Sequence, residues 1–308
     1  MKELKGVMAL IPTPLTEDGR VDEGSLRRMI DYEMDNGCFG VGVAAAIGEG
    51  YLLSKEDRRK LIRVSRDHLK DRGPLIAGVP ALGTEEAVEK CIEAEDCGAD
   101  AVLAFNPKWK GKKPFGNNEL VDHYTAMREA VKIHIVPYSQ EDDLVPFEVL
   151  KELVEAKVIA HIKYAWNDCD LLKTITEYFG DRLFVFLGAD TYTLRYLLLG
   201  ARGISTATAA VFPKANSTLL SLVQAGDIEG ARKLYNDNIV PWNDCGFYQR
   251  WQLCHKLALQ LIGVIDSTRC LPPLTNALAD YQADEIKWML KNQGLLACTK
   301  TKAGACKL

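Results

Sequence analysis

The sequence predicts an α/β fold: a closed (β/α)8 TIM barrel followed by a C-terminal helical appendage. Short apolar runs alternate with amphipathic stretches at a steady interval, and the runs number eight. Eight strands with intervening helices are the count of a parallel barrel. A doubly wound sheet, the alternative for this alternation, needs about five or six strands and a topological switch. No G-x-G-x-x-G motif follows an early run to support that alternative.

The apolar runs fall within the length of about four to eight residues that is typical of buried strands. The predicted strands are Gly6–Pro12, Gly40–Ala46, Pro74–Val79, Ala101–Asn106, Ile133–Tyr138, Val158–Tyr164, Leu183–Asp190 and Gly203–Ala209.

Amphipathic stretches separate these strands and predict helices. Ser54 with Asp57 three residues later resembles a capping box, and Thr84 is expected to cap the third helix. The predicted helices are Asp22–Asn36, Ser54–Lys70, Thr84–Cys97, Asn118–Val131, Pro146–Ala156, Cys169–Phe179, Thr191–Leu199 and Lys214–Gln224. Glycines that favour left-handed helix ends follow four of them, at Gly37, Gly98, Gly180 and Gly200.

After residue 225 the pattern predicts helices only, at Ile228–Asn238, Phe247–Gly263 and Thr275–Asn292. We therefore expect a barrel domain over residues 1–225 and helices packed on it over residues 226–296. Residues 297–308 have little apolar surface to bury, and the expectation for them is a mobile tail.

The composition excludes several classes of function. A net charge of −4 argues against a nucleic-acid partner, which needs a basic stripe. No apolar stretch approaches the roughly 20 residues that span a bilayer. Nine cysteines are scattered without a C-x-x-C pair or a Cys/His cluster. This usage favours a reducing, cytoplasmic location and predicts no metal site.

The most informative residue is Lys163, which follows the apolar run Val158–Ile162. In a parallel barrel the carboxyl end of a strand lies at the catalytic rim. An amine in apolar surroundings loses proton affinity, and a neutral lysine attacks carbonyls. Imine chemistry is the leading hypothesis. The alternative, a lysine that caps the strand end in solvent, stays open from this run alone.

Alternation along strands gives a further expectation. If Lys163 points into the barrel, so does His161; if Tyr138 points inward, so does His134. The two histidines would then lie at or beneath the lysine. A satisfied interior hydrogen-bonded pair is one interpretation, and a proton relay is the other.

Several motifs in these positions resemble a known family. They are Pro12-Thr13-Pro14, Asp18-Gly19, Gly48-Glu49, Ile162-Lys163, Leu187–Asp190 and Gly200–Ser205. Together, over Gly6 to Leu296, they are similar to the dihydrodipicolinate synthase/N-acetylneuraminate lyase family of class I aldolases.

The resemblance implies a Schiff base between Lys163 and the ketone of a small 2-oxo acid, pyruvate or a pyruvate-yielding sugar acid. No metal or organic cofactor takes part. Ala46, Ile47 and Gly48 fall on the family's carboxylate-binding loop. Gly188 and Ser205, in the last two motifs, would also line the substrate site. Family members are often tetramers, so the resemblance implies a homo-oligomer, either a dimer or a tetramer.

The family's proton-shuttling tyrosine has two candidate positions. When the family's Y-N-V-P sequence is aligned with His134–Pro137 without a gap, its tyrosine corresponds to His134. With a gap in the following loop, the tyrosine is Tyr138. Either side chain relays protons, so both remain candidates.

Three departures from the family pattern bear on activity. The paired threonines of the carboxylate loop are Ala46 and Ile47 here, and the second relay tyrosine falls at Trp109. The arginine of the lysine-biosynthesis enzymes has no counterpart in Ser139–Asp142. These departures disfavour authentic dihydrodipicolinate synthase activity.

Three hypotheses follow. The first is a lyase, aldolase or dehydratase acting on a 2-oxo acid through Lys163. The second is a catalytically silent barrel that serves as a small-molecule binding protein or a regulatory protein. The third, a metal-dependent hydrolase, ranks last because His134 and His161 are the only histidines on the predicted strands.

Overall fold

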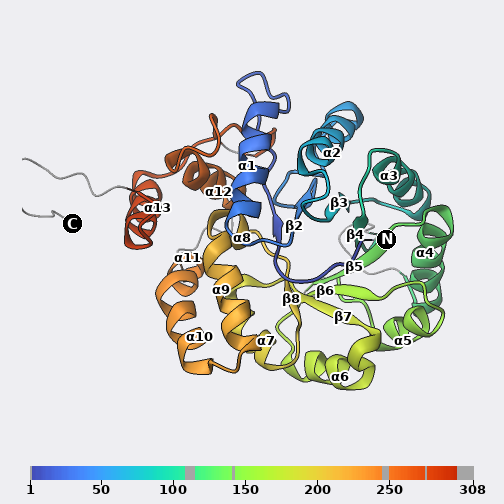
Figure 1. The fold of residues 1–308 in the computed structure, drawn as a ribbon. Helices are drawn as coiled ribbons and strands as arrows, with labels where there is room; N and C mark the ends of the chain where they lie inside the picture. The colour runs from blue at the N-terminus through green and yellow to red at the C-terminus, as the bar shows by residue number, and fades with distance from the viewer. Residues whose placement is uncertain (1, 108–114, 141–142, 245–249, 275, 297–308) are drawn as a thin grey trace, which may run out of the picture.

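The computed structural model is a barrel of eight parallel strands enclosed by helices (Figure 1). It describes residues 2–107, 115–140, 143–244, 250–274 and 276–296. The strands pair in sequence order from β1 to β8. A parallel bridge between Val7 and Ile204 closes the barrel, and the Ile204 amide donates to the Gly6 carbonyl at 3.0 Å.

All eight predicted strands form. Their bounds are Met8–Leu10 (β1), Gly40–Val43 (β2), Leu75–Val79 (β3), Ala101–Phe105 (β4), His134–Gln140 (β5), His161–Ala165 (β6), Phe184–Leu187 (β7) and Gly203–Ile204 (β8).

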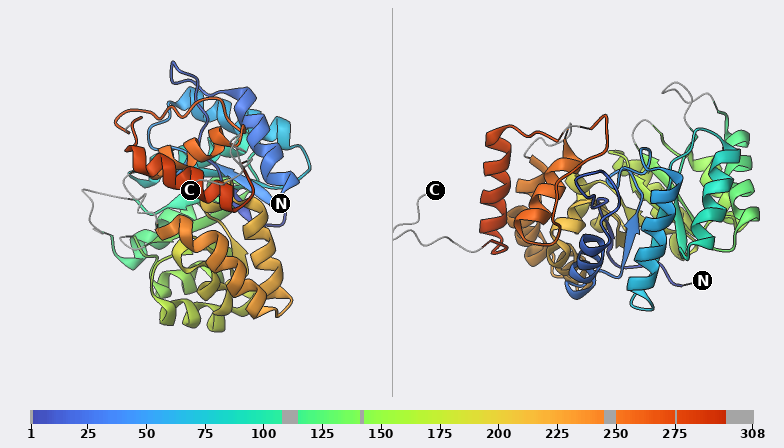
Figure 2. Two further views of the ribbon diagram at one scale, coloured as in Figure 1. Left: turned by 90° about the vertical axis from the view of Figure 1, so that its left-hand side faces the viewer. Right: turned by 90° about the horizontal axis from the view of Figure 1, so that it is seen from above.

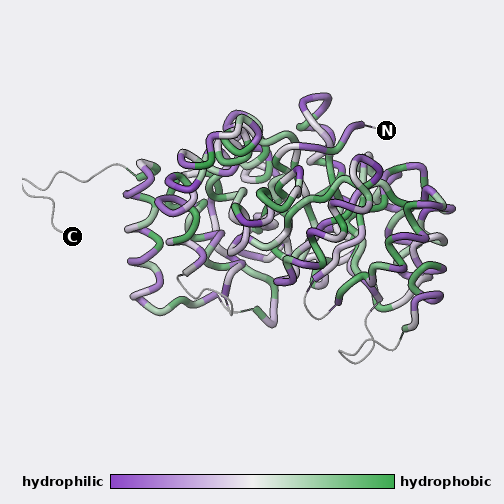
Figure 3. Tube along the Cα trace, turned by 90° about the horizontal axis from the view of Figure 1, so that it is seen from below, coloured by the Kyte–Doolittle hydropathy of each residue, from purple (hydrophilic) through white to green (hydrophobic). Residues whose placement is uncertain are grey.

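Helices surround the strands, and along the tube of Figure 3 the outer helices alternate hydrophobic and hydrophilic stretches. Such alternation lets one face of a helix pack on the sheet while the other meets water. The helices that follow the first six strands are Glu23–Asp35 (α1), Lys55–Leu69 (α2), Thr84–Asp96 (α3), Asn117–Ala130 (α4), Phe147–Glu155 (α5) and Cys169–Phe179 (α6). The later barrel elements are the 3₁₀ turns Gly180–Arg182 (η1) and Asp190–Tyr192 (η2) and the helices Thr193–Leu198 (α7), Thr208–Val211 (α8) and Pro213–Gln224 (α9).

Glycines make room for large side chains inside the barrel. A Cβ on Gly42 would lie 2.4 Å from a methyl of Leu10, and one on Gly203 would lie 2.6 Å from the Phe186 ring. Leu10 and Phe186 belong to the interior cluster that fills the barrel. The interior is therefore packed with side chains, as in other parallel barrels of this size.

Helix ends agree with most of the sequence signals. Ser54 accepts a hydrogen bond from the Asp57 amide at 3.0 Å, which confirms its capping role. All four predicted glycine ends have positive φ, at Gly37, Gly98, Gly180 and Gly200. The prediction for Thr84 is wrong: Gly83 is the N-cap, and the Thr84 hydroxyl contacts Nδ1 of His123 at 2.9 Å instead.

Strands β7 and β8 end earlier than the sequence predicts. The chain leaves β7 at Leu187 and enters η2 at Asp190, and after Ile204 it turns into helix α8. The residues of α8 are buried throughout. An apolar run that is buried on all sides has no periodicity to separate strand from helix, which explains the error.

The chain beyond α9 is helical, as predicted, and lies at one side of the barrel (Figure 2). Its elements are Ile228–Leu234 (α10), the π-helical turn Tyr235–Ile239 (η3), Val240–Asp244 (α11), Trp251–Leu261 (α12) and Asp280–Asn292 (α13). Helix α12 contacts both α8 and α13, which joins the appendage to the barrel. Among the described residues, no helix has the length and apolar character that crossing a membrane requires.

Candidate active site

Lys163 is the third residue of β6 and lies inside the barrel, with only 4% of its surface exposed. Its Nζ lies 4.0 Å from the centroid of the Tyr138 ring, and the two residues are directly paired between β5 and β6. A Cβ on Gly188 would lie 2.4 Å from Cε of Lys163, so this glycine leaves room for the lysine stem. The prediction that Lys163 points into the barrel is confirmed.

The surroundings of Lys163 favour a neutral amine. Burial lowers the pKa of the Lys163 ammonium from 10.5 to about 7, while the negative charge of Asp190 acts in the opposite direction. At neutral pH, Lys163 is therefore an unprotonated nucleophile in about half of the molecules. An exposed lysine with a pKa near 10.4 would be neutral in only roughly one molecule in 2,500.

Asp190 supplies a carboxyl group to this site. It begins η2, directly after β7. Burial raises the pKa of its carboxyl group, whereas hydrogen bonds from Thr206 and Thr208 and the charge of Lys163 lower it. Its Oδ1 is shielded from solvent and has no hydrogen-bond partner among the described residues. Sequence reasoning placed Asp190 in a strand motif but gave it no role, although its position after a barrel strand was a usable signal.

Tyr138 supplies a phenol beside the amine. Its ring makes an edge contact with Phe105, with centroids 5.1 Å apart, and Phe105 makes a similar contact with Tyr51 at 5.6 Å. Burial raises the pKa of the Tyr138 hydroxyl above its usual value, so the group is a protonated phenol at neutral pH. Tyr51 is 52% exposed, so this row of aromatic rings runs from the surface to the lysine.

The loop after β2 contains the predicted carboxylate-binding residues. The Thr13 hydroxyl donates to the Gly48 carbonyl at 2.6 Å. A Cβ on Gly48 would lie 3.1 Å from both the Ala44 amide nitrogen and the Ile11 carbonyl oxygen, so the loop is closely packed. Within the described part of the chain, the amides of Ile47 and Gly48 donate to no protein acceptor. Two free amides beside each other can bind an anion.

The family model described as the dihydrodipicolinate synthetase family matches residues 3–293. The chain belongs to this family. A curated relative, 4-hydroxy-tetrahydrodipicolinate synthase of Syntrophus aciditrophicus, is 30% identical over 95% of this chain and 99% of its own length. The enzyme of the same name from Trichlorobacter lovleyi is 32% identical over 87% and 92%.

Solved structures of the family have the same fold. The chloride-inhibited dihydrodipicolinate synthase of Acinetobacter baumannii, complexed with pyruvate, is 29% identical with a TM-score of 0.86. The alignment covers 95% of this chain and 99% of that one. A further neighbour is the dihydrodipicolinate synthase of Thermotoga maritima, which is 25% identical with a TM-score of 0.87 and coverage of 95% and 99%. The predicted (β/α)8 fold and the predicted family are both confirmed.

The structure does not bring His134 to the lysine. His134 is the first residue of β5, and its Nε2 lies 3.0 Å from the carbonyl oxygen of Lys2 at the opposite end of the barrel. Tyr138 lies four residues further along the strand, or about 13 Å away at roughly 3.3 Å per residue. Of the two candidate positions for the family tyrosine, only Tyr138 lies beside Lys163.

The two histidines lie beneath the lysine as alternation predicts, with ring centroids 4.7 Å apart in an edge contact. The interpretation of a satisfied hydrogen-bonded pair is wrong, because Nδ1 of His161 is buried without a partner among the described residues. Burial, together with the charges of His134 and Arg202, lowers the pKa of His161 to about 4.

Two other predicted site residues have different outcomes. Ser205 follows β8 and is buried at 3% exposure, with its amide donating to the Leu187 carbonyl at 2.8 Å. No contact in the described structure tests its predicted part in substrate binding. Trp109 lies outside the described residues.

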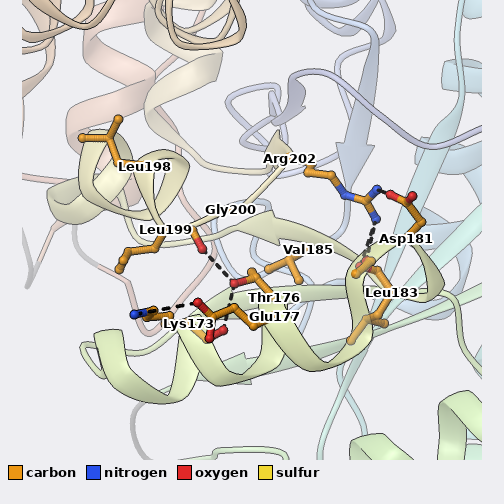
Figure 4. Close-up of a pocket in the computed structure, with 11 residues that line it drawn as sticks. Lys173, Thr176, Glu177, Asp181, Leu183, Val185, Leu198, Leu199, Gly200 and Arg202 are labelled. Atoms are coloured by element: carbon orange, nitrogen blue, oxygen red, sulfur yellow. Dashed lines mark hydrogen bonds and ion pairs between the residues drawn. The ribbon is translucent and has the colours of Figure 1, made fainter. Parts of the chain in front are cut away.

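A surface hollow of about 390 Å³ between α6 and the start of β8 is shown in Figure 4. Its walls include the ion pair between Arg202 and Asp181, 2.6 Å apart, and the bond from the Thr176 hydroxyl to the Leu199 carbonyl. Arg202 precedes β8, so the hollow lies at the end of the barrel away from Lys163. It is separate from the candidate active site.

Proposed function

We propose that this protein is a class I aldolase or lyase that forms a Schiff base between Lys163 and the ketone of a 2-oxo acid. One observation carries the proposal: an amine that is 4% exposed, with a pKa lowered to about 7, lies beside a phenol at the carboxyl end of the barrel.

The chemistry follows from the protonation states. Neutral Lys163 attacks the ketone carbon, a C–N bond forms, and the carbonyl oxygen leaves as water after it accepts protons. Tyr138 is the proton donor and acceptor in this step, because its hydroxyl is a phenol at neutral pH. In C–C cleavage, the protonated imine accepts the electrons of the breaking bond and becomes an enamine, while the hydroxyl on the departing carbon loses its proton and becomes an aldehyde carbonyl. In loss of water, the carbon beside the imine first loses a proton to give the enamine, which then expels the hydroxyl group of the next carbon as water.

Asp190 has a distinct role in this proposal. The protonated imine is a cation in a buried site, and an isolated buried charge is costly. The Asp190 carboxylate compensates that charge, and Thr206 and Thr208 favour its ionised form. It is thus an electrostatic stabiliser of the intermediate.

The substrate carboxylate is assigned to the loop after β2. Ile47 and Gly48 offer backbone amides, and neither side chain there carries a hydroxyl. Backbone donors select an anion through charge and position. The Acinetobacter baumannii relative is described in complex with pyruvate, which supports a small 2-oxo acid as the ligand.

Two reactions compete for the physiological role. The names of the relatives favour 4-hydroxy-tetrahydrodipicolinate synthesis. The residues Ala46 and Ile47, in place of paired threonines, and the absence of an arginine in Ser139–Asp142 favour a different partner for the 2-oxo acid. We propose the second, a lyase acting on a pyruvate-yielding acid.

The experiment is borohydride reduction in the presence of pyruvate, followed by activity assays. An adduct on Lys163 supports the Schiff base, and no adduct under saturating pyruvate favours a catalytically silent barrel. Cleavage or dehydration of 2-oxo-3-deoxy sugar acids, without formation of 4-hydroxy-tetrahydrodipicolinate, supports the proposed substrate class. The reverse outcome assigns the activity named for the relatives.

The homo-oligomer implied by the resemblance is part of the proposal. Tyr51, Leu52 and Leu82 are exposed large apolar side chains on loops at the carboxyl end of the barrel. A second copy that covers them would remove them from water. Light scattering at micromolar concentration distinguishes a dimer or tetramer from a monomer such as the variant described among the structural neighbours.

A further inference from the structure

Glu49 and Lys256 form a buried ion pair that joins the substrate loop to the C-terminal appendage. Lys256 Nζ lies 2.5 Å from Glu49 Oε1, and both side chains are 0% exposed. Glu49 follows β2, whereas Lys256 lies in α12, 207 residues later. The catalytic proposal uses neither residue.

Each member of the pair makes a second bond to the same segment of the appendage. Glu49 Oε2 accepts from the Leu271 amide at 2.6 Å, and Lys256 Nζ donates to the Arg269 carbonyl at 2.5 Å. The charges are therefore compensated and hydrogen-bonded, which is the condition under which a buried pair is tolerated. Four groups from two distant parts of the chain are fixed together.

The loop needs such support because its backbone is strained. Glu49 has φ of +58° and Ala44 has φ of +54°, both in the left-handed region that residues with a Cβ rarely adopt. The Glu49 amide donates to the Ala46 carbonyl at 3.2 Å, so the loop folds back and leaves the intervening amides of Ile47 and Gly48 free. Strained conformations persist where the surroundings hold them.

We propose that Glu49 and Lys256 are positioning residues that hold the Ile47 and Gly48 amides in the geometry that binds the substrate carboxylate. This inference rests on the proposed Schiff-base function. Among the interactions of the described residues, neither member of the pair contacts Lys163, so the pair acts on affinity for the 2-oxo acid and leaves the reactivity of the amine unchanged. The C-terminal helices are thereby part of the binding site.

The test measures borohydride trapping of pyruvate as a function of pyruvate concentration. Lys256→Met, which leaves Glu49 without its cation, is expected to raise the half-saturating pyruvate concentration by about 10- to 100-fold, since small displacements of positioned groups have effects of this size. The trapping rate at saturation and its pH midpoint should stay within about twofold and a few tenths of a pH unit of wild type, because burial of Lys163 is unchanged.

The matched control is Glu93→Gln. Arg58 and Glu93 form the other ion pair in the described residues with both side chains buried, at 3% and 6% exposure, and lie on α2 and α3. This variant breaks a comparable pair with a comparable loss of stability, but half-saturation by pyruvate should stay near the wild-type value.

Glu49→Gln is the second test variant and serves where Lys256→Met does not fold. It keeps an acceptor for the Leu271 amide, so the half-saturating pyruvate concentration is expected to rise by about 3- to 10-fold.

The outcomes separate this inference from the function on which it rests. If wild type shows no adduct at any pyruvate concentration, the Schiff-base proposal fails and this inference with it. A second outcome is that wild type forms the adduct, but Lys256→Met and Glu49→Gln have the same half-saturating pyruvate concentration as Glu93→Gln. In that case only the positioning role is overturned. A parallel shift of half-saturation and pH midpoint also overturns it, since that indicates general loosening of the barrel.

Discussion

The two ends of the barrel both bury a base on β6, yet only one end can host a cation. Lys163 and His161 are two residues apart, and burial lowers the pKa of each. At Lys163 the neighbouring charge is the carboxylate of Asp190, which favours a cation. At His161 the neighbouring charges are those of His134 and Arg202, which oppose one.

The comparison shows that desolvation alone does not define a catalytic base. Burial is the largest cause of the lowered pKa at both ends, where the pKa is about 7 for Lys163 and about 4 for His161. The amino end is also filled by the N-terminal segment: Leu4 belongs to the interior cluster, and the Lys2 carbonyl contacts His134. The carboxyl end instead carries a loop with free amides, so it has both the charge and the groups that a substrate needs.

The largest expected effect comes from Lys163→Met. Without the amine no imine forms, so trapping and turnover should fall by at least about 10³-fold. Adduct formation with borohydride and steady-state assays measure this. Activity that survives the substitution and is lost on addition of a chelator would revive a metal-dependent mechanism.

The same variant should stabilise the fold. The lowering of the Lys163 pKa from 10.5 to about 7 corresponds to a destabilisation of at most roughly 5 kcal/mol. We expect the free energy of unfolding at pH 7 to rise by about 1–3 kcal/mol. Because the folded pKa lies below the unfolded one, the penalty in wild type is greatest below pH 7 and disappears as the pH approaches 10.5. Denaturant unfolding of both proteins at several pH values measures the difference.

Tyr138→Phe is expected to have the next largest effect. The ring that packs on Lys163 and Phe105 remains, but the hydroxyl that relays protons is lost, so turnover should fall by about 10²- to 10³-fold. Thermal unfolding should be nearly unchanged and serves as the control. A variant with wild-type turnover would remove Tyr138 from the mechanism and return attention to other proton donors.

Asp190→Asn changes the pH dependence. Wild-type trapping should rise with pH through a midpoint near 7, as Lys163 loses its proton. Removal of the carboxylate takes away the charge that favours the ammonium form, so the midpoint should move to lower pH by about one unit or less. The rate at saturation should also fall, because the protonated imine loses its counter-charge. A shift to higher pH would contradict the assigned role of Asp190.

His161→Asn should have the smallest effect. His161 is neutral at neutral pH and has no contact with Lys163 among the described interactions. Turnover and pH profile between about pH 6 and about pH 9 should match wild type within about twofold. A changed pH profile would instead support the hypothesis of a proton relay between the two histidines.

Sequence reasoning located the barrel and the lysine because both depend on local patterns. Apolar runs of strand length and glycines after helices are visible in the chain, and Lys163 closes one such run. Asp190 and the Glu49–Lys256 pair were missed as functional groups because they meet only in three dimensions, and no periodicity links residue 49 to residue 256. The choice between His134 and Tyr138 needed the register of β5 against β6, which pairs Tyr138 with Lys163.

The central claim is that Lys163 has a pKa near 7 in the free protein, so that about half of the molecules carry a neutral amine at pH 7. Isotopic labelling of lysine and NMR titration of the ε-amine, assigned by its absence in Lys163→Met, measures this directly. The account predicts one lysine that titrates near pH 7. A Lys163 resonance that titrates near the ordinary value of about 10.4 would contradict the account.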